Sequence, residues 1–251
     1  KQTSRPGLYH SFYIHEPKRR LISAAPFRDR VVHHALYAVI GPLFERGFIA
    51  RSYASIKGRG THRAVAVYEK LRDRHGHVLR ADVFRYFPAI DHAVLKEDLR
   101  RRIVCAQTLW LCDTIIDGSN AQEPVDRYFP GDDLFTPLER RRGLPIGNLT
   151  SQLFGNVYLD PLDHYVSEVL RAPYLRYLDD FALFDDDPDR LALWREQIAR
   201  FLEKRRLLLH PLKTEVRETR LPSRFLGYML GPGSRRSLPK ENLIRLRGRL
   251  R

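Results

Sequence analysis

Long apolar runs and cysteine are both scarce in this sequence, and each scarcity excludes a class of protein. No apolar stretch approaches the ~18–20 residues that cross a bilayer, and the first 15 residues lack the apolar core of a signal peptide. The 2 cysteines, Cys105 and Cys112, are spaced for one helix face rather than for a disulfide or a metal site. We therefore expect reduced thiols, a cytoplasmic location and no membrane segment.

Acidic residues are scarce in the first third of the chain, and basic residues outnumber acidic ones at both ends but not at the centre. Residues 1–80 hold 16 Lys and Arg against 5 Asp and Glu, residues 81–180 hold 11 against 16, and residues 181–251 hold 17 against 9. Basic flanks favour a polyanionic partner, because each phosphate contact releases counterions. An acidic centre in such a protein then indicates metal ions, which can lie between carboxylates and phosphates.

Apolar periodicity predicts the order of the secondary structure, with residues 117–143 as an exposed loop. From residue 78 onward the order is consistent with a split β-α-β sheet covered by helices on one face. The expected helices are 28–48 (kinked or shortened by Pro42), 61–71, 93–103, 150–170 (broken at Pro161) and one starting at Pro188, and the expected strands are 78–83, a hairpin over 174–184, 207–209 and 224–230.

Three carboxylates stand in apolar surroundings that do not explain them. Asp82 lies within a buried strand pattern, where an unpaired Asp is costly. Asp179 and Asp180 are adjacent at the expected hairpin tip and bracketed by apolar residues, so they repel each other. Divalent cations relieve this repulsion, and two of them can bind the attacking and leaving oxygens of a displacement at phosphorus. Hard oxygen ligands favour Mg²⁺.

The segment around the paired acids matches a family signature. Tyr177-Leu178-Asp179-Asp180 matches the Tyr-x-Asp-Asp motif of reverse transcriptases, and over most of residues 10–245 further blocks resemble that family in the same order. These are Asp82 with Phe87 as the first palm carboxylate and its aromatic gate, Leu144-Pro145-Ile146-Gly147 as the nucleotide and template block, Lys213 within His210-Pro211-Leu212-Lys213-Thr214 as the fourth palm block, and Phe225-Leu226-Gly227-Tyr228 as the primer grip.

This resemblance implies a role for each matching residue. Asp82, Asp179 and Asp180 would hold a pair of Mg²⁺ ions, with Mn²⁺ as a substitute, and Lys213 would protonate or neutralise the leaving pyrophosphate. Phe87 would be the sugar gate that selects deoxynucleotides. The nucleotide-binding set is Lys18, Arg20, Phe87, Ile146, Gly147 and Tyr177, and the nucleic-acid-binding set is Arg59, Arg63, Gln152, Phe225, Leu226, Gly227 and Tyr228.

The same resemblance implies an α+β fold of the right-hand polymerase type. We expect fingers over 1–77, palm over 78–105, an insertion with an exposed loop over 106–143, palm again over 144–230 and the start of a thumb over 231–251. A thumb normally follows the primer grip, so here it is absent or only begun. Either the sequence is part of a longer protein, or a partner protein supplies the missing clamp.

One group within the family matches most closely. The block Ile146-Gly147-Asn148-Leu149-Thr150-Ser151-Gln152 resembles that of diversity-generating retroelement enzymes. Most reverse transcriptases carry Gln where this chain has Ile146, and the resemblance implies error-prone copying of template adenines. It also implies a basic, helical accessory protein that forms an oligomer. Group II intron and retron enzymes are the nearest alternatives.

Two other functions remain open from the residues. One is a non-catalytic RNA-binding scaffold that keeps the polymerase fold, and the other is a polymerase that makes RNA from RNA. The three carboxylates argue against the scaffold, and the aromatic Phe87 argues against the RNA-making enzyme. The leading hypothesis is an RNA-directed DNA polymerase whose partners are an RNA template, a DNA or RNA primer and deoxynucleoside triphosphates.

Overall fold

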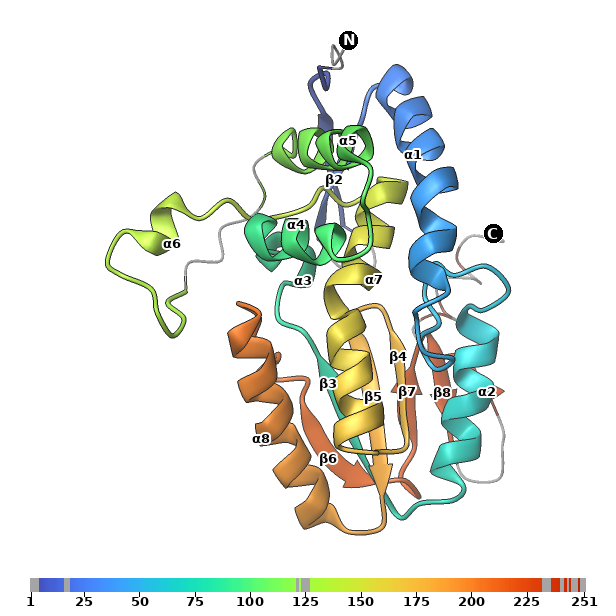
Figure 1. Cartoon of the computed structure of the whole chain (residues 1–251). Helices are drawn as coiled ribbons and strands as arrows, with labels where there is room; N and C mark the ends of the chain where they lie inside the picture. The colour runs from blue at the N-terminus through green and yellow to red at the C-terminus, as the bar shows by residue number, and fades with distance from the viewer. Residues whose placement is uncertain are drawn as a thin grey trace. The chain divides into compact units, whose positions relative to one another are not determined.

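The chain divides into two compact units, each built from three separate stretches of sequence. The computed structural model describes residues 5–15, 19–120, 122, 127–231 and 236–239, together with residues 242, 244 and 248 (Figure 1). The first unit comprises Lys1–Ile49, Val83–His164 and Ala199–His210, and the second comprises Ala50–Asp82, Tyr165–Ile198 and Pro211–Arg251. No helix among the described residues combines the length and the apolar character needed to cross a bilayer.

The first unit is mainly helical. Helix α7 packs against α1 and α4, and buried residues on nearly every side make α7 the centre of the unit. Strands β1 and β2 form an antiparallel ribbon that precedes these helices. The elements are β1 (His10–Ile14), β2 (Arg20–Ala24), α1 (Phe27–Glu45), α3 (Tyr86–Ala89), α4 (His92–Arg100), α5 (Ala106–Asp117), α6 (Thr136–Glu139) and α7 (Leu149–His164).

The second unit is built on a four-stranded antiparallel sheet in the order β4-β5-β3-β6. Helix α2 packs against β4 and β5, and a smaller sheet follows in the order β7-β8-β9. The elements are α2 (Thr61–Arg72), β3 (His77–Asp82), a π-helix (Tyr165–Val169), β4 (Tyr174–Tyr177), β5 (Asp180–Asp185), β6 (Glu215–Glu218), β7 (Ser223–Phe225), β8 (Tyr228–Leu230) and β9 (Arg236–Ser237); α8 (Pro188–Lys204) contributes to both units.

Tyr68 on α2 organises the core of the second unit. Its ring stacks on Phe225 with centroids 4.4 Å apart and meets the edge of Phe184 at 5.1 Å. Its hydroxyl lies 3.0 Å from that of Ser223, so the one polar group of this side chain is satisfied in a buried place. A single aromatic ring therefore joins the helix, the large sheet and the small sheet.

The predicted α+β fold is confirmed, whereas three local predictions are wrong. The single strand expected over 224–230 is instead the two strands β7 and β8, which pair with each other. Helix α7 does not break at Pro161 but continues to His164 before a π-helical turn, because its packing on nearly all sides offsets one lost hydrogen bond. Residues 207–209 form no strand and pair only through a bridge between Leu209 and Val83. The sequence also gave no sign of β6, a polar strand at the edge of its sheet, where apolar alternation is not required.

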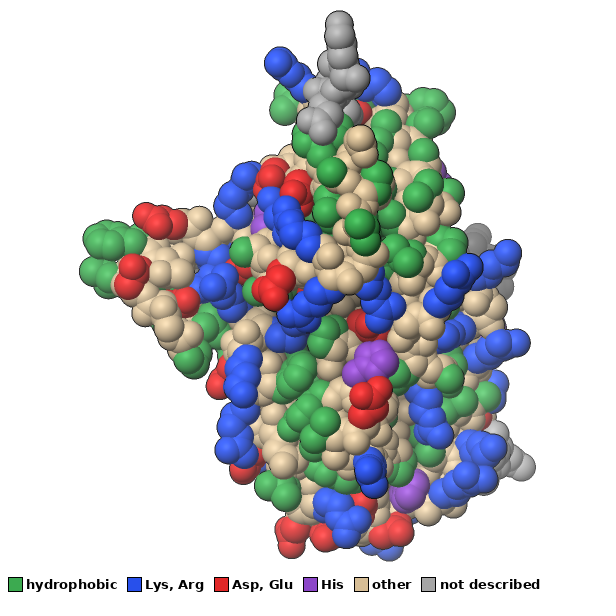
Figure 2. Space-filling model, in the orientation of Figure 1, with side chains coloured by type: hydrophobic (Ala, Val, Ile, Leu, Met, Phe, Trp, Pro, Cys, Tyr) green, Lys and Arg blue, Asp and Glu red, His purple; other side chains and the backbone are tan. Residues whose placement is uncertain are grey.

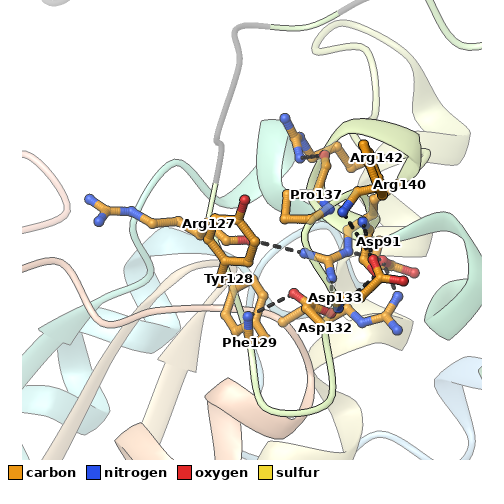
Figure 3. A network of polar contacts seen from close by, with 12 residues as sticks. Asp91, Arg127, Tyr128, Phe129, Asp132, Asp133, Pro137, Arg140 and Arg142 are labelled. Carbon is orange, nitrogen blue, oxygen red and sulfur yellow. Dashed lines mark hydrogen bonds and ion pairs between the residues drawn. The ribbon is translucent and has the colours of Figure 1, made fainter.

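Asp91 joins three segments of the first unit (Figure 3). One carboxylate oxygen caps α4 by accepting from the amides of Ala93 and Val94 at 2.9 and 3.1 Å. The other lies 2.6 Å from Nη1 of Arg206 and 3.5 Å from Nε of Arg140. Asp91 is only 1% exposed, so its charge is balanced by these two cations rather than by water.

We expect Asp91→Asn to lower the free energy of unfolding by about 3 kcal/mol, because the amide keeps the helix cap but leaves two partly buried guanidinium groups short of an anion. Asp187→Asn is the matched control, since Asp187 is an exposed acid that accepts from the amides of Asp189 and Arg190 at the start of α8. Urea unfolding of both variants measures the difference. Equal losses would show that capping alone accounts for Asp91.

Candidate active site

Strand register places the three predicted carboxylates at one end of the large sheet. Asp82 is the last residue of β3 and stands directly opposite Asp180, the first residue of β5. Asp179 precedes it in the turn that joins β4 to β5. Leu178, also in this turn, takes a left-handed backbone conformation with φ 60°. Residues nearly a hundred positions apart in the sequence therefore converge within the second unit.

Crowding of the carboxylates changes the protonation of Asp180. Burial, the negative charges of Asp179 and Asp82 and a hydrogen bond to Asp82 together raise the pKa of Asp180 to about 7. Lys213 opposes this shift and donates from Nζ to Oδ2 of Asp82 at 2.6 Å. Near neutral pH Asp180 therefore keeps a shared proton for much of the time.

These residues have the donor chemistry of a magnesium site. Among the described residues, no group of three or more His, Cys, Asp or Glu side chains is placed so that it could hold a metal ion by itself. Mg²⁺ does not need such a group, since it usually binds one or two carboxylates together with waters and substrate phosphates. Mutually repelling, partly buried carboxylate oxygens fit that demand, and a bound cation would replace the proton on Asp180.

A buried arginine that the sequence analysis missed supports the turn. Arg176 on β4 is fully buried, and its Nη1 donates to the carbonyl oxygen of Leu178 at 2.9 Å. Its backbone amide donates to the carbonyl of Arg51 at 2.9 Å. The side chain thus holds the backbone next to Asp179 from inside the protein. A charged residue within the apolar pattern of β4 was the available signal for it.

Other predicted residues of the second unit lie around α2. The hydroxyl of Tyr177 is 3.0 Å from that of Thr61, the first residue of α2. Arg63 is exposed on this helix, whereas Arg59 donates from Nη1 to the carbonyl of Ser52 at 2.7 Å. Figure 2 shows Lys and Arg side chains over the part of the surface where Figure 1 draws α2.

The predicted primer-grip residues form a hairpin between β7 and β8. Leu226 and Gly227 make its turn with φ 46° and 84°, the two positive values that a tight hairpin turn of this kind requires. Phe225 is buried against Tyr68, whereas the Tyr228 hydroxyl lies 3.4 Å from Nδ1 of His62 on α2. The hairpin therefore presents Tyr228 beside the start of α2 and keeps Phe225 in the core.

The other predicted site residues that the structure describes belong to the first unit. The amide of Ser23 on β2 donates to the carbonyl of Ile146 at 2.9 Å, which joins the ribbon that carries Arg20 to this block. Gly147 has φ 120°, and a Cβ atom there would lie 3.2 Å from the Ile22 side chain.

Phe87 and Gln152 are the other described residues of the predicted sets that belong to the first unit. Phe87 is buried on α3, and its carbonyl accepts from the amide of Leu144 at 2.9 Å. Gln152 is partly buried in the first turn of α7. Lys18 lies outside the described residues.

We expect Asp180→Asn to stabilise the metal-free chain more at pH 8 than at pH 5. The folded-state pKa of about 7 exceeds the unfolded value of about 3.9, so the folded chain binds the extra proton between these values. The stability of the natural chain therefore falls as pH rises from about 4 to 7, whereas Asn does not titrate. Urea unfolding in EDTA measures this, with Asp187→Asn as the control. An advantage that does not grow with pH would contradict it.

Comparison with known proteins identifies a family and a relative of this chain. Residues 14–230 match the family model described as reverse transcriptase (RNA-dependent DNA polymerase). Protein YkfC of Escherichia coli (strain K12) is 27% identical over 156 residues, which are 60% of this chain and 38% of YkfC.

Solved telomerase structures share the fold. The apo telomerase of Candida tropicalis aligns with a TM-score of 0.61 at 12% identity, over 95% of this chain and 49% of that one. Telomerase of Candida albicans, in complex with a fragment of telomeric RNA, aligns with a TM-score of 0.57 at 14% identity, over 92% and 46%. The chain thus spans about half or less of the length of each of these relatives.

Proposed function

Because the chain belongs to the reverse transcriptase family, we propose that it extends a DNA or RNA primer by copying an RNA template from deoxynucleoside triphosphates. The observation that carries this proposal is the placement of Asp82 opposite Asp180 and beside Asp179. A protein that only binds RNA gains nothing from partly buried carboxylates that repel one another, so the arrangement favours catalysis over a scaffold.

In this proposal Asp82, Asp179 and Asp180 would together hold a pair of Mg²⁺ ions. When bound, the ions neutralise charge that develops on the attacking and leaving oxygens. Positioning supplies the rest of the rate acceleration. Strand β3 fixes Asp82, and the turn before β5 fixes Asp179 with the help of Arg176.

Lys213 would neutralise or protonate the leaving pyrophosphate. The contact between its ammonium group and Asp82 supports a place beside the reacting groups. Lys213 would exchange this contact with Asp82 for one with the phosphates when the substrate binds.

The first unit would supply the contacts to the incoming nucleotide. Phe87 would exclude a 2′-hydroxyl by contact with the sugar, and Arg20, together with Lys18, would bind the triphosphate. Ile146 and Gly147 would lie against the nascent base pair, and Tyr177 would lie near the nucleotide from the hairpin of the second unit. The link between β2 and Ile146 supports this division of roles.

A more specific proposal concerns the subtype. The chain would be an error-prone enzyme of a diversity-generating retroelement, and this enzyme would work with a basic helical accessory oligomer. The apolar Ile146 supports it, since its side chain offers no hydrogen bond to hold the correct base pair. A group II intron or retron enzyme is the alternative within the same chemistry. The accessory protein is proposed only for the diversity-generating subtype.

Primer extension on a homopolymer RNA template tests the activity. We expect Asp179→Asn to reduce deoxynucleotide incorporation by at least about 100-fold, because it removes a carboxylate that acts on the developing charge. Asp187→Asn should retain full incorporation, and EDTA should stop both. Ribonucleotides offered in parallel test the sugar selection assigned to Phe87. Normal extension by the Asp179→Asn variant would refute the catalytic assignment.

We expect Ile146→Gln to lower misincorporation opposite template adenine by about tenfold, since a polar side chain restores a geometric check on the base pair. The contact between Ser23 and residue 146 is made by the backbone carbonyl and does not depend on the side chain, and circular dichroism checks that the variant is folded. Sequencing of products made on a template with all four bases measures the effect. Errors opposite the other bases provide the internal control, and an unchanged rate opposite adenine would exclude the error-prone subtype.

A further inference from the structure

Helix α1 exposes an apolar face along its whole length. Phe27, Val31, Val39 and Leu43 are 74%, 54%, 69% and 40% exposed, and Ala35 between them is exposed as well. The opposite side of the same helix is buried through Leu36, Ile40 and Phe44. Figure 2 shows hydrophobic side chains over the region where Figure 1 draws α1. A helix that is apolar all round is normally buried all round.

Charge is absent from the middle of this face. The exposed residues between positions 31 and 43 are Val31, His34, Ala35, Ala38, Val39, Pro42 and Leu43, and none of them is Lys, Arg, Asp or Glu. Charged residues make up 29% of the chain, so this gap is not an ordinary stretch of its surface. A face without cations is a poor surface for RNA, whose binding depends on phosphate contacts.

The spacing of the apolar residues makes the face complementary to itself. Phe27, Val31, Ala35, Val39 and Leu43 recur every four residues and form one ridge, and the small Ala35 lies at its midpoint. If two copies of α1 cross in antiparallel fashion at Ala35, Val31 of each copy meets Val39 of the other, and Phe27 meets Leu43. The large residues are thus distributed symmetrically about a small one that permits close approach.

We propose that this face binds a second copy of the chain through an antiparallel, two-fold pair of α1 helices. A two-fold interface uses one patch twice, and the ridge of α1 satisfies that condition residue by residue. The same register brings Arg28 of one copy within one helical turn of Glu45 of the other, so opposite charges meet at both ends. This self-association is independent of the polymerase activity proposed above.

The pair is expected to be weak. The helix has 19 residues and is therefore about 28 Å long, too short to bury the ~1,600 Å² of a standard interface by itself. We expect a monomer–dimer equilibrium that shifts between roughly 1 and 100 μM. Sedimentation velocity of the nuclease-treated chain over this range should show the sedimentation coefficient rising with concentration. A chain that remains monomeric throughout would overturn the proposal.

A charge exchange tests the antiparallel register. Val31→Glu and Val39→Lys should each abolish the concentration dependence, because each places a charge against a valine of the other copy. The double variant should recover it, since only the antiparallel pair brings residue 31 opposite residue 39. Singles that dissociate without recovery in the double variant would exclude this register, and singles that still dimerise would exclude the α1 face. Circular dichroism confirms that each variant is folded.

Cross-linking locates the two-fold axis. In a Cys105→Ala background, which removes the exposed native thiol, Ala35→Cys should form a disulfide-linked dimer under mild oxidation. His34→Cys is the matched control, because His34 is also exposed on the same helix but lies about 100° around it from the ridge residue Ala35. Equal cross-linking of both variants, or of neither, would contradict a crossing at Ala35.

Discussion

Repulsion between Asp82 and Asp180 is the constraint around which the second unit is organised. The two carboxylates are held opposite each other by the pairing of β3 with β5, whose apolar residues fill the core of that unit. A slip of one residue would turn every one of those side chains to the other face, so burial of the strands enforces the meeting of the acids. Hydrophobic packing thus holds together groups that would otherwise separate, and Lys213 and a shared proton reduce the cost.

Much of this fold was predictable from the sequence because its strongest patterns are local. The hairpin around Asp179, the helix that begins at Pro188 and the strand that ends at Asp82 follow from apolar periodicity and turn residues. The α+β class follows from their order. Apolar periodicity does not show which strand or helix packs against which other one. The edge strand β6 carries no apolar pattern, and the continuation of α7 past Pro161 depends on neighbours from elsewhere in the chain.

The candidate site shows the same division. The residue types of the three acids and their apolar surroundings indicated a metal-dependent reaction, and the motif order indicated the family that the comparisons then established. The contact of Lys213 with Asp82 joins residues far apart in the sequence, and the support that Arg176 gives to the turn depends on its burial. The spacing of residues along the sequence shows neither of these contacts. The sequence therefore indicates which residues form the site, but not how their charges offset one another.

Because each unit is built from separate stretches of the sequence, the order of synthesis on the ribosome affects how the protein folds. The sheet of the second unit cannot close until β5 has emerged, roughly 100 residues after β3, which at ordinary rates of synthesis takes about 5–20 s. During that interval the apolar sides of α2 and β3 lack the strands that later cover them. The nascent chain is therefore a natural client for chaperones that shield unfinished sheets, and slow translation between these strands would prolong that exposure.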